Sequence, residues 1–329
     1  MSHHNHTMAR EAASRRKMLN VRLADALHEL GHARERSVRM CSNITTVYSC
    51  PQCGHTHTSG ALYCQHRLCP ICQPRRARKL ALEATTVVGY LRASGALTGV
   101  GMHLLTLTQR NVEDGKLDTE IDRMLKSLGQ LLDKRAWRRD IVGAARNIEI
   151  TRNYAQSTWH PHIHMIVMIR EGSPLTGADY WRTNWQSTME LDYTPIIDVR
   201  PVEDDGAIYE VSKYVAKSIS LLERLTRGER ARVLGELIGA THNRNLVAYT
   251  GIWRKARKAC KIPAETDDAQ QQDDSTDDCG VCGTALEHTV MQWAGTQYMP
   301  ALVDRTTSTV KGATGPAKRR ASALDGAAT

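Results

Sequence analysis

The chain has 329 residues, which is enough for one large domain or two smaller ones with a buried core. Its formal net charge is +9, but residues 264–278 carry seven acids and no base, whereas residues 1–263 carry 39 Lys and Arg against 25 Asp and Glu, a net of +14. A body this basic favours a polyanionic partner, with nucleic acid first, although a merely soluble basic protein would have the same composition. The N-terminus lacks the apolar stretch of a signal peptide and no run of about 18 apolar residues exists, so we expect a cytoplasmic protein without a membrane span.

Hydrophobic spacing predicts helices and strands that alternate without the regular order of a βαβ fold. Helices are expected at about 9–36, 75–94, 118–139, 178–190, 205–219 and 221–239, and strands at 103–108, 147–152, 160–170 and 194–202. This order favours an α+β fold in which helices pack on one face of an antiparallel sheet. Along the chain we expect an N-terminal helical segment (1–40), a zinc-binding module (41–75), the main domain (76–263), an acidic disordered linker (264–278), a small C-x-x-C module (279–303) and a flexible tail (304–329).

The chain has nine cysteines, an odd number, which favours metal binding in a reducing compartment over a disulfide framework. Cys50-x2-Cys53 is followed by fifteen residues and then by Cys69-x2-Cys72, which is the spacing of a tetrahedral zinc site. Four thiolates would close the coordination sphere, so we expect structural and not catalytic zinc. The residues between the pairs leave an exchange of ligands open, and these are His55, His57, Cys64 and His66.

A third pair, Cys279 and Cys282, is only half of a metal site. Cys260, His288 or a second chain could complete it, but a lone C-x-x-C is a weak signal.

Basic residues flank the predicted zinc module. Candidates for contact with DNA phosphates are Arg67, Arg75, Arg76, Arg78, Lys79 and, further along the chain, Lys213. A solvated basic helix start would look the same.

Three histidines, His160, His162 and His164, fall at alternate positions and lead directly into an apolar run. Alternate residues of a strand share one face and stand about 7 Å apart, so two of these imidazoles can hold one divalent metal. The apolar run that follows is typical of a buried strand. A surface cluster of histidines that binds nothing is the alternative.

A possible nucleophile lies on the predicted helix at 205–219. Glu210, Tyr214 and Lys217 share one helical face because they are spaced by four and three residues. A Tyr hydroxyl has a pKa near 10, so it needs a neighbouring cation or base to act as a nucleophile. Lys217 would supply the charge and Glu210 would take a proton, although an ordinary half-buried Tyr has the same pattern. Tyr209 competes as a nucleophile but is badly phased with both charged residues.

Together these blocks resemble the HUH endonuclease superfamily and, more closely, the single-tyrosine initiators of rolling-circle plasmid replication. The likeness spans about residues 40–260 and rests on Cys64–Lys79, Leu104–Asn111, Trp159–Met168 and Tyr209–Lys217. A weaker similarity to these initiators follows at Arg244–Lys258.

The resemblance implies an RRM-like or ferredoxin-like sheet on which His162 and His164 hold Mg²⁺ or Mn²⁺. It makes Glu149 the third ligand, which a hairpin pairing 147–152 with 160–165 would support, although an ordinary strand carboxylate is equally compatible. It makes Tyr214 the nucleophile at the plasmid origin, leaving a 5′-phosphotyrosine and a free 3′-hydroxyl. Glu210 would then activate water or a second attack at termination.

The implied partners are origin DNA, single-stranded or extruded at the nick, and a host polymerase that extends the 3′-hydroxyl. The sequence has no G-x-x-x-x-G-K-[ST] loop, so unwinding would fall to a host helicase. Two alternatives stay open: a transposase or phage initiator with the same chemistry, and a zinc-ribbon DNA-binding regulator without catalysis.

Overall fold

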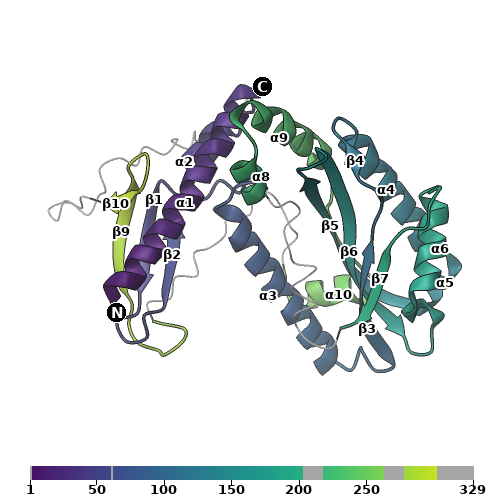
Figure 1. Ribbon diagram of the computed structural model, residues 1–329. Coiled ribbons are helices and arrows are strands. Elements are labelled where there is room, and N and C mark those ends of the chain that lie inside the picture. Colours follow the sequence, from purple (N-terminus) through teal and green to yellow (C-terminus); the bar gives the residue numbers. More distant parts are fainter. Residues whose placement is uncertain (1, 61, 203–217, 263–277, 302–329) are drawn as a thin grey trace, which may run out of the picture.

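The computed structural model describes residues 2–60, 62–202, 218–262 and 278–301 (Figure 1). The predicted acidic linker, except Asp278, the tail at 304–329 and residues 205–217 of one predicted helix lie outside these ranges.

The main sheet is antiparallel at every pairing between described strands, which confirms the α+β fold class with an antiparallel sheet. Its strand order is β7-β3-β6-β5-β8, and the short β4 pairs with β6. The strands are β3 (Val100–Leu107), β4 (Val112–Glu113), β5 (Ile141–Asn153), β6 (Thr158–Arg170), β7 (Ile197–Pro201) and β8 (Val247–Thr250). The long β5–β6 hairpin lies at the centre, and β6 is buried along most of its length because both of its faces are covered.

Helices pack on both faces of this sheet, so the prediction of helices on one face is wrong. On one face lie α4 (Leu117–Asp133), α5 (Arg135–Asp140), the 3-10 turn η1 (Pro174–Thr176), α6 (Ala178–Thr188) and α9 (Arg227–Thr241), while α8 (Ser218–Arg224) contacts the N-terminal helix. On the other lie α3 (Cys72–Ala93) and α10 (Gly251–Ala259) (Figure 1). The β6 strand shows the division, since Ile163 and Met165 pack in the first core whereas Ile166 and Met168 pack against α3 and α10 in the second.

The start of α10 explains why glycine occupies position 251. Gly251 has a φ of +55°, and a Cβ there would stand 2.0 Å from the carbonyl oxygen of Val142 on β5. Only a residue without a side chain tolerates both the left-handed backbone and this approach. The close approach seats α10 on the sheet, where Trp253 is buried in the second core.

A second, smaller sheet has the order β10-β9-β1-β2. Its strands are β1 (Ile44–Ser49), β2 (Thr56–Gly60), β9 (Glu287–Trp293) and β10 (Tyr298–Pro300). Because β9 pairs with β1 over six residues, the described part of the predicted C-x-x-C module, residues 279–301, is not separate but completes the sheet that contains β1 and β2.

The N-terminal segment is helical as predicted and forms α1 (Ser2–Glu29) and α2 (Glu35–Met40). Leu19, Leu23 and Leu27 are buried in the first core, and Arg15 pairs with Glu223 of α8 at 2.6 Å. Among the described residues no helix is long and apolar enough to cross a membrane.

Candidate metal centres and active site

The central hairpin brings a carboxylate and two imidazoles together. Glu149 of β5 pairs directly with His162 of β6, and His164 is the next residue on the same face. Nε2 of His162 lies 2.9 Å and Nε2 of His164 lies 3.1 Å from the same oxygen, Oε2 of Glu149. Glu149 and His164 are buried and His162 is half-buried. The predicted hairpin is therefore confirmed, although residues 147–152 pair with 159–164 and not with 160–165, a shift of one residue. We call Glu149, His162 and His164 the sheet centre.

The far nitrogens of both imidazoles are held by neighbouring groups. Nδ1 of His162 lies 3.2 Å from the carbonyl oxygen of His160, and Nδ1 of His164 lies 3.2 Å from Oγ1 of Thr106 on β3. A carbonyl only accepts, so Nδ1 of His162 donates to it, and in a neutral imidazole Nε2 then presents a lone pair to Glu149. Two acceptor atoms at this separation repel each other unless a cation or a proton lies between them.

The separations in the sheet centre fit a small divalent ion. Adjacent ligands of an octahedral ion with bonds of about 2.1 Å stand about 3.0 Å apart, close to the two separations of Glu149 from the imidazoles. Carboxylate ligands suit Mg²⁺ and Mn²⁺, whereas imidazole ligands suit Zn²⁺, Fe²⁺, Cu²⁺ and Ni²⁺, so this mixed ligand set is compatible with several divalent ions. The ring of His160, the third histidine of the motif, lies 5.2 Å from the His162 ring and is tilted by 35° to it, and His160 is not part of the cluster. Burial lowers the pKa of His160, and the neighbouring His162 lowers it further.

The cysteines form two clusters, and the grouping of Cys50 and Cys53 with Cys69 and Cys72 is wrong. The buried sulfur cluster joins Cys69 and Cys72 to Cys41 and Cys64. The second, which we call the exposed sulfur cluster because Cys53 and Cys282 are exposed, joins these two residues to the buried Cys50 and Cys279. The physical reason lies in the second sheet: β9 pairs with β1 and carries the last cysteine pair to the end of β1, whereas the loop after β2 leads back to Cys41.

A buried cation, the ammonium of Lys17, lies beside the buried sulfur cluster. Lys17 of α1 is fully buried, and its Nζ donates to the carbonyl oxygens of Arg39 at 2.7 Å and Cys41 at 2.6 Å. Asn20 accepts from the same Nζ at 3.3 Å and donates to Sγ of Cys69 at 3.4 Å. Burial lowers the pKa of Lys17 to about 8, and the nearby cysteine sulfurs oppose that fall.

Comparison with known proteins identifies the family. A family model described as "Replication protein" matches residues 55–299. The chain belongs to this family. Similar curated proteins include "Protein rep" of Streptococcus pneumoniae serotype 2, which is 28% identical over 260 residues covering 75% of this chain and 79% of the relative. "Protein rep" of a Bacillus sp. is 29% identical over 248 residues, covering 68% of this chain and 79% of the relative. No solved structure matches the chain.

The family match confirms the resemblance to replication initiators that the sequence motifs indicated. It also extends past residue 260, where that resemblance ended, and includes β9 and Cys279 with Cys282. The last cysteine pair of this replication protein thus lies within the family region.

The residues predicted to carry the nucleophilic chemistry, Tyr214, Glu210 and Lys217, lie outside the described residues, as does Lys213. Their roles stay predictions. The described chain resumes at α8, whose Ser220 accepts a hydrogen bond from the hydroxyl of Tyr154 at 3.0 Å. Tyr154 directly follows β5, the strand that carries Glu149.

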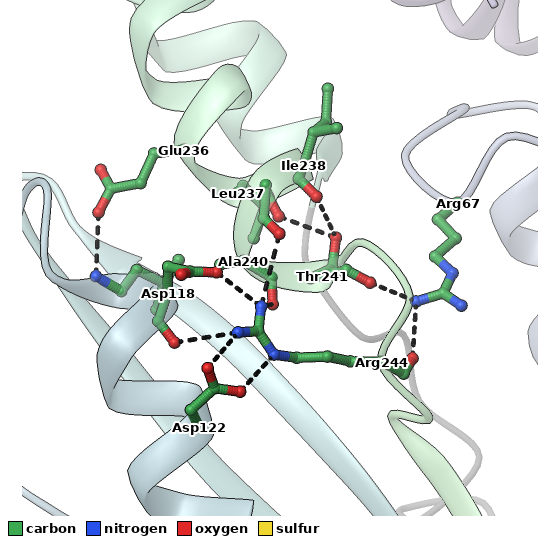
Figure 2. Close-up of polar contacts among 11 residues, drawn as sticks. Arg67, Asp118, Asp122, Glu236, Leu237, Ile238, Ala240, Thr241 and Arg244 are labelled. Atoms are coloured by element: carbon green, nitrogen blue, oxygen red, sulfur yellow. Dashed lines mark hydrogen bonds and ion pairs between the residues drawn. The ribbon is translucent and has the colours of Figure 1, made fainter.

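Several basic residues predicted to bind DNA make contacts within the protein. Arg67 donates to the carbonyl oxygens of Thr241 at 3.0 Å and Arg244 at 3.3 Å, which ties the cysteine-rich loop to the end of α9 (Figure 2). The guanidinium of Arg75 lies over the Tyr63 ring at 4.1 Å. Arg76 similarly donates to the carbonyl of Gln65 at 3.1 Å. Arg78 is exposed and Lys79 half-buried on α3. Contact of all five with DNA stays a prediction.

Sequence reasoning missed Cys41 and Thr106. Cys41 stands alone in the sequence, so the search for C-x-x-C pairs passed over it, and only its spacing before Cys64 hinted at a role. Thr106 was assigned to a strand, but its contact with His164 depends on the pairing of β3 with β6, which local sequence does not specify.

Proposed function

We propose that this replication protein initiates rolling-circle plasmid replication by nicking one strand of origin DNA. The observation that carries the proposal is the convergence of His162 and His164 on Oε2 of Glu149. A non-catalytic zinc-ribbon regulator has no use for a buried carboxylate facing two imidazoles. The family match favours a replication initiator over a transposase. We further infer that the main sheet is of the RRM-like kind shared by HUH nucleases, which its wholly antiparallel described pairings support.

The sheet centre would hold Mg²⁺ or Mn²⁺. Bound there, the ion would act as a Lewis acid on a phosphate oxygen and stabilise the charge that develops during displacement. The protein's own residues fix the ligands: Thr106 and the His160 carbonyl orient the imidazoles so that both Nε2 atoms face Glu149. The sheet centre lies on the same sheet face as Ile166 and Met168, which α3 and α10 cover. Basic residues of α3 such as Arg78 would contact the DNA backbone there.

Tyr214 would be the nucleophile. Its hydroxyl oxygen forms a bond to phosphorus while the bond to the 3′-oxygen breaks, the phenol loses its proton and the 3′-oxygen gains one. The products are a 5′-phosphotyrosine and a free 3′-hydroxyl, and the link conserves the phosphodiester energy without ATP. Lys217 would stabilise the phenolate, and Glu210 would accept a proton or activate water at termination. The contact of α8 with the hairpin supports this, because the chain returns to the strand of Glu149 soon after the tyrosine.

The buried sulfur cluster would hold structural zinc. Its sulfur separations of 3.6 Å for Cys41 and Cys72, 3.7 Å for Cys41 and Cys69, and 3.8 Å for Cys64 and Cys72 match a tetrahedron with bonds of about 2.3 Å, whose edges are about 3.8 Å. Zinc with four thiolates carries two negative charges, which supplies the partner that a fully buried Lys17 ammonium requires.

Incubation with supercoiled origin plasmid and Mn²⁺ tests the nicking proposal. We expect a relaxed circle with protein attached to its 5′ end, and no such product from Tyr214→Phe although DNA binding persists. Tyr209→Phe is the matched control and should nick normally. Nicking that survives Tyr214→Phe and is lost in Tyr209→Phe would move the nucleophile, and a lack of nicking by the wild type would leave a DNA-binding protein.

A further inference from the structure

The exposed sulfur cluster joins two parts of the chain that are more than 220 residues apart. Sγ of Cys50 lies 3.4 Å from Sγ of Cys282, and Sγ of Cys53 lies 3.5 Å from that of Cys279 and 3.6 Å from that of Cys282. We propose that these four cysteines form a second zinc site, which fastens the β9–β10 hairpin to β1 and β2. This site is additional to the structural zinc expected at the buried sulfur cluster.

The separations fit one ion better than two disulfides. A tetrahedral Zn²⁺ with bonds of about 2.3 Å places its sulfurs about 3.8 Å apart, whereas a disulfide needs a bond of about 2.05 Å. Cys53 and Cys282 each have two sulfur neighbours within this range, so the four sulfurs form one group and not two separate pairs. Four thiols that bind Zn²⁺ release their protons, and the resulting site is closed to a fifth ligand.

The two halves of the site have the same backbone design. Cys50-Pro-Gln-Cys53 and Cys279-Gly-Val-Cys282 are each followed by a glycine, and Gly54 and Gly283 have φ angles of +70° and +72°. In each half the glycine N–H donates to the carbonyl of the first cysteine, at 3.0 Å in one and 2.7 Å in the other. In each half the N–H of the first cysteine donates at 2.8 Å to the carbonyl oxygen of the residue after the glycine, which is His55 in one and Thr284 in the other. Two matching knuckles that face each other are what one tetrahedral ion requires.

The Cys69–Cys72 pair differs from these knuckles. Cys72 begins α3 and is followed by Gln73, with no glycine. Only the first and last C-x-x-C pairs therefore share the knuckle form, and they are the two that the structure brings together.

The second sheet has a small apolar core. Among the described residues, its buried apolar cluster consists of Val47, Met291 and Tyr298, with Ala13 and Trp293 packed against them. A core this small rarely stabilises a sheet without a disulfide or a metal. The hydroxyl of Thr284 also donates to the side chain of Gln52 beside the sulfurs, so the two knuckles make direct contact. The zinc would supply the stability that the small core lacks.

Metal content of the full chain tests the proposal. Native mass spectrometry of the zinc-loaded wild type should show two zinc ions per chain, and the double variant Cys279→Ser with Cys282→Ser should show one. Cys260→Ser is the matched control, because Cys260 is half-buried and outside both clusters, and it should retain two. Two ions retained by the double variant, or one ion in the wild type, would overturn the proposal.

Thiol labelling of the wild type tests the same point without a variant that might fail to fold. Cys53 and Cys282 are exposed, so in the absence of a bound ion iodoacetamide should alkylate both at least as fast as Cys260. With zinc bound we expect at least a tenfold slower reaction at both, reversed by a chelator. Equal rates with and without zinc would refute the site, and chelator-resistant protection that a reductant removes would assign disulfides instead. Neither readout depends on nicking. His55, whose Nδ1 lies 3.9 Å from Sγ of Cys279, is an alternative ligand, and His55→Ala should leave the zinc count at two.

Discussion

The sheet centre and the buried sulfur cluster are assembled in opposite ways. Glu149, His162 and His164 stand on two strands of one hairpin, so backbone pairing places them before any ion binds. The sulfurs of Cys41, Cys64, Cys69 and Cys72 come from a helix end, a loop and the start of α3, and little backbone pairing links these segments. If ions bind as we propose, the one at the sheet centre would serve chemistry, whereas the one at the buried sulfurs would serve the fold. Substitutions at the two sites should therefore affect different measurements.

The largest expected effect is at the buried sulfur cluster. Structural zinc contributes about 10–16 kcal/mol to folding in zinc-finger peptides, so loss of one thiolate should remove much of the stability of the region. We expect Cys69→Ser to lose one zinc ion and to show no cooperative thermal transition of the wild-type kind by circular dichroism. Cys260→Ser should melt like the wild type. A Cys69→Ser protein with an unchanged Tm would make the buried sulfurs ordinary core residues and break the comparison.

The second effect separates chemistry from folding at the sheet centre. Glu149→Gln keeps the shape of the side chain but removes the charge that an ion and two imidazoles share. We expect the rate of origin nicking to fall about a thousandfold, which corresponds to about 4 kcal/mol in activation free energy, because the metal ion that would position the phosphate is bound less well. Its Tm should change by only a few degrees, since the hairpin register does not depend on the carboxylate. Glu171→Gln, in the exposed turn after β6, is the control. A collapse of stability together with the activity would assign the sheet centre to the fold as well.

A smaller effect tests the charge of the buried sulfur cluster. Lys17→Met fills nearly the same volume without the ammonium that donates to the Cys41 carbonyl. If the sulfurs hold zinc as thiolates, removal of the neighbouring cation should weaken zinc affinity about 10–100-fold, as measured by competition with a chelator. If the sulfurs are neutral thiols, removal of a buried charge should leave stability unchanged or raise it. The exposed Lys126→Met on α4 is the matched control.

The contrast between the centres also explains how much of the site the sequence could predict. The shared face of His162 and His164 was predictable because alternate positions on a strand point the same way. Glu149 was named from the family resemblance, and the predicted hairpin supported it although its register was one residue off. The sulfur partners were not predictable, because a four-cysteine spacing does not say which distant segment a strand will bring close. Cys279 and Cys282 reach Cys50 only through the pairing of β9 with β1, across more than 220 residues. The glycine after each knuckle was the one local signal, and spacing alone overlooked it.

The fold was predictable to a similar limit. The strands β3, β6 and β7 and the helix α3 lie close to their predicted ranges. The strand β5 was predicted at 147–152 but begins six residues earlier, at Ile141. The packing of helices on the second face of the main sheet was not predicted. The helix α10 is short, and its packing against β5 depends on the close contact of Gly251 with the backbone of Val142, two residues far apart in the sequence. The pairing of β9 with β1 likewise depends on contacts between distant segments.

The smallest expected effect compares two basic residues beside the buried sulfur cluster. Arg67 donates to two backbone carbonyls near the end of α9, whereas Arg78 is exposed on α3 (Figure 2). Arg78→Ala should leave the Tm unchanged but reduce the slope of log affinity for DNA against log salt by about one, because one phosphate contact is lost. Arg67→Ala should leave the salt slope unchanged but lower the free energy of unfolding by about 1–3 kcal/mol, because the carbonyl oxygens of Thr241 and Arg244 lose their hydrogen-bond donor. Fluorescence anisotropy with a labelled single strand at several salt concentrations measures the slopes, and urea unfolding measures the stabilities. If Arg67→Ala alone lowered the slope, the guanidinium would leave α9 to reach DNA, and the cysteine-rich loop would belong to the DNA-binding surface instead of the fold.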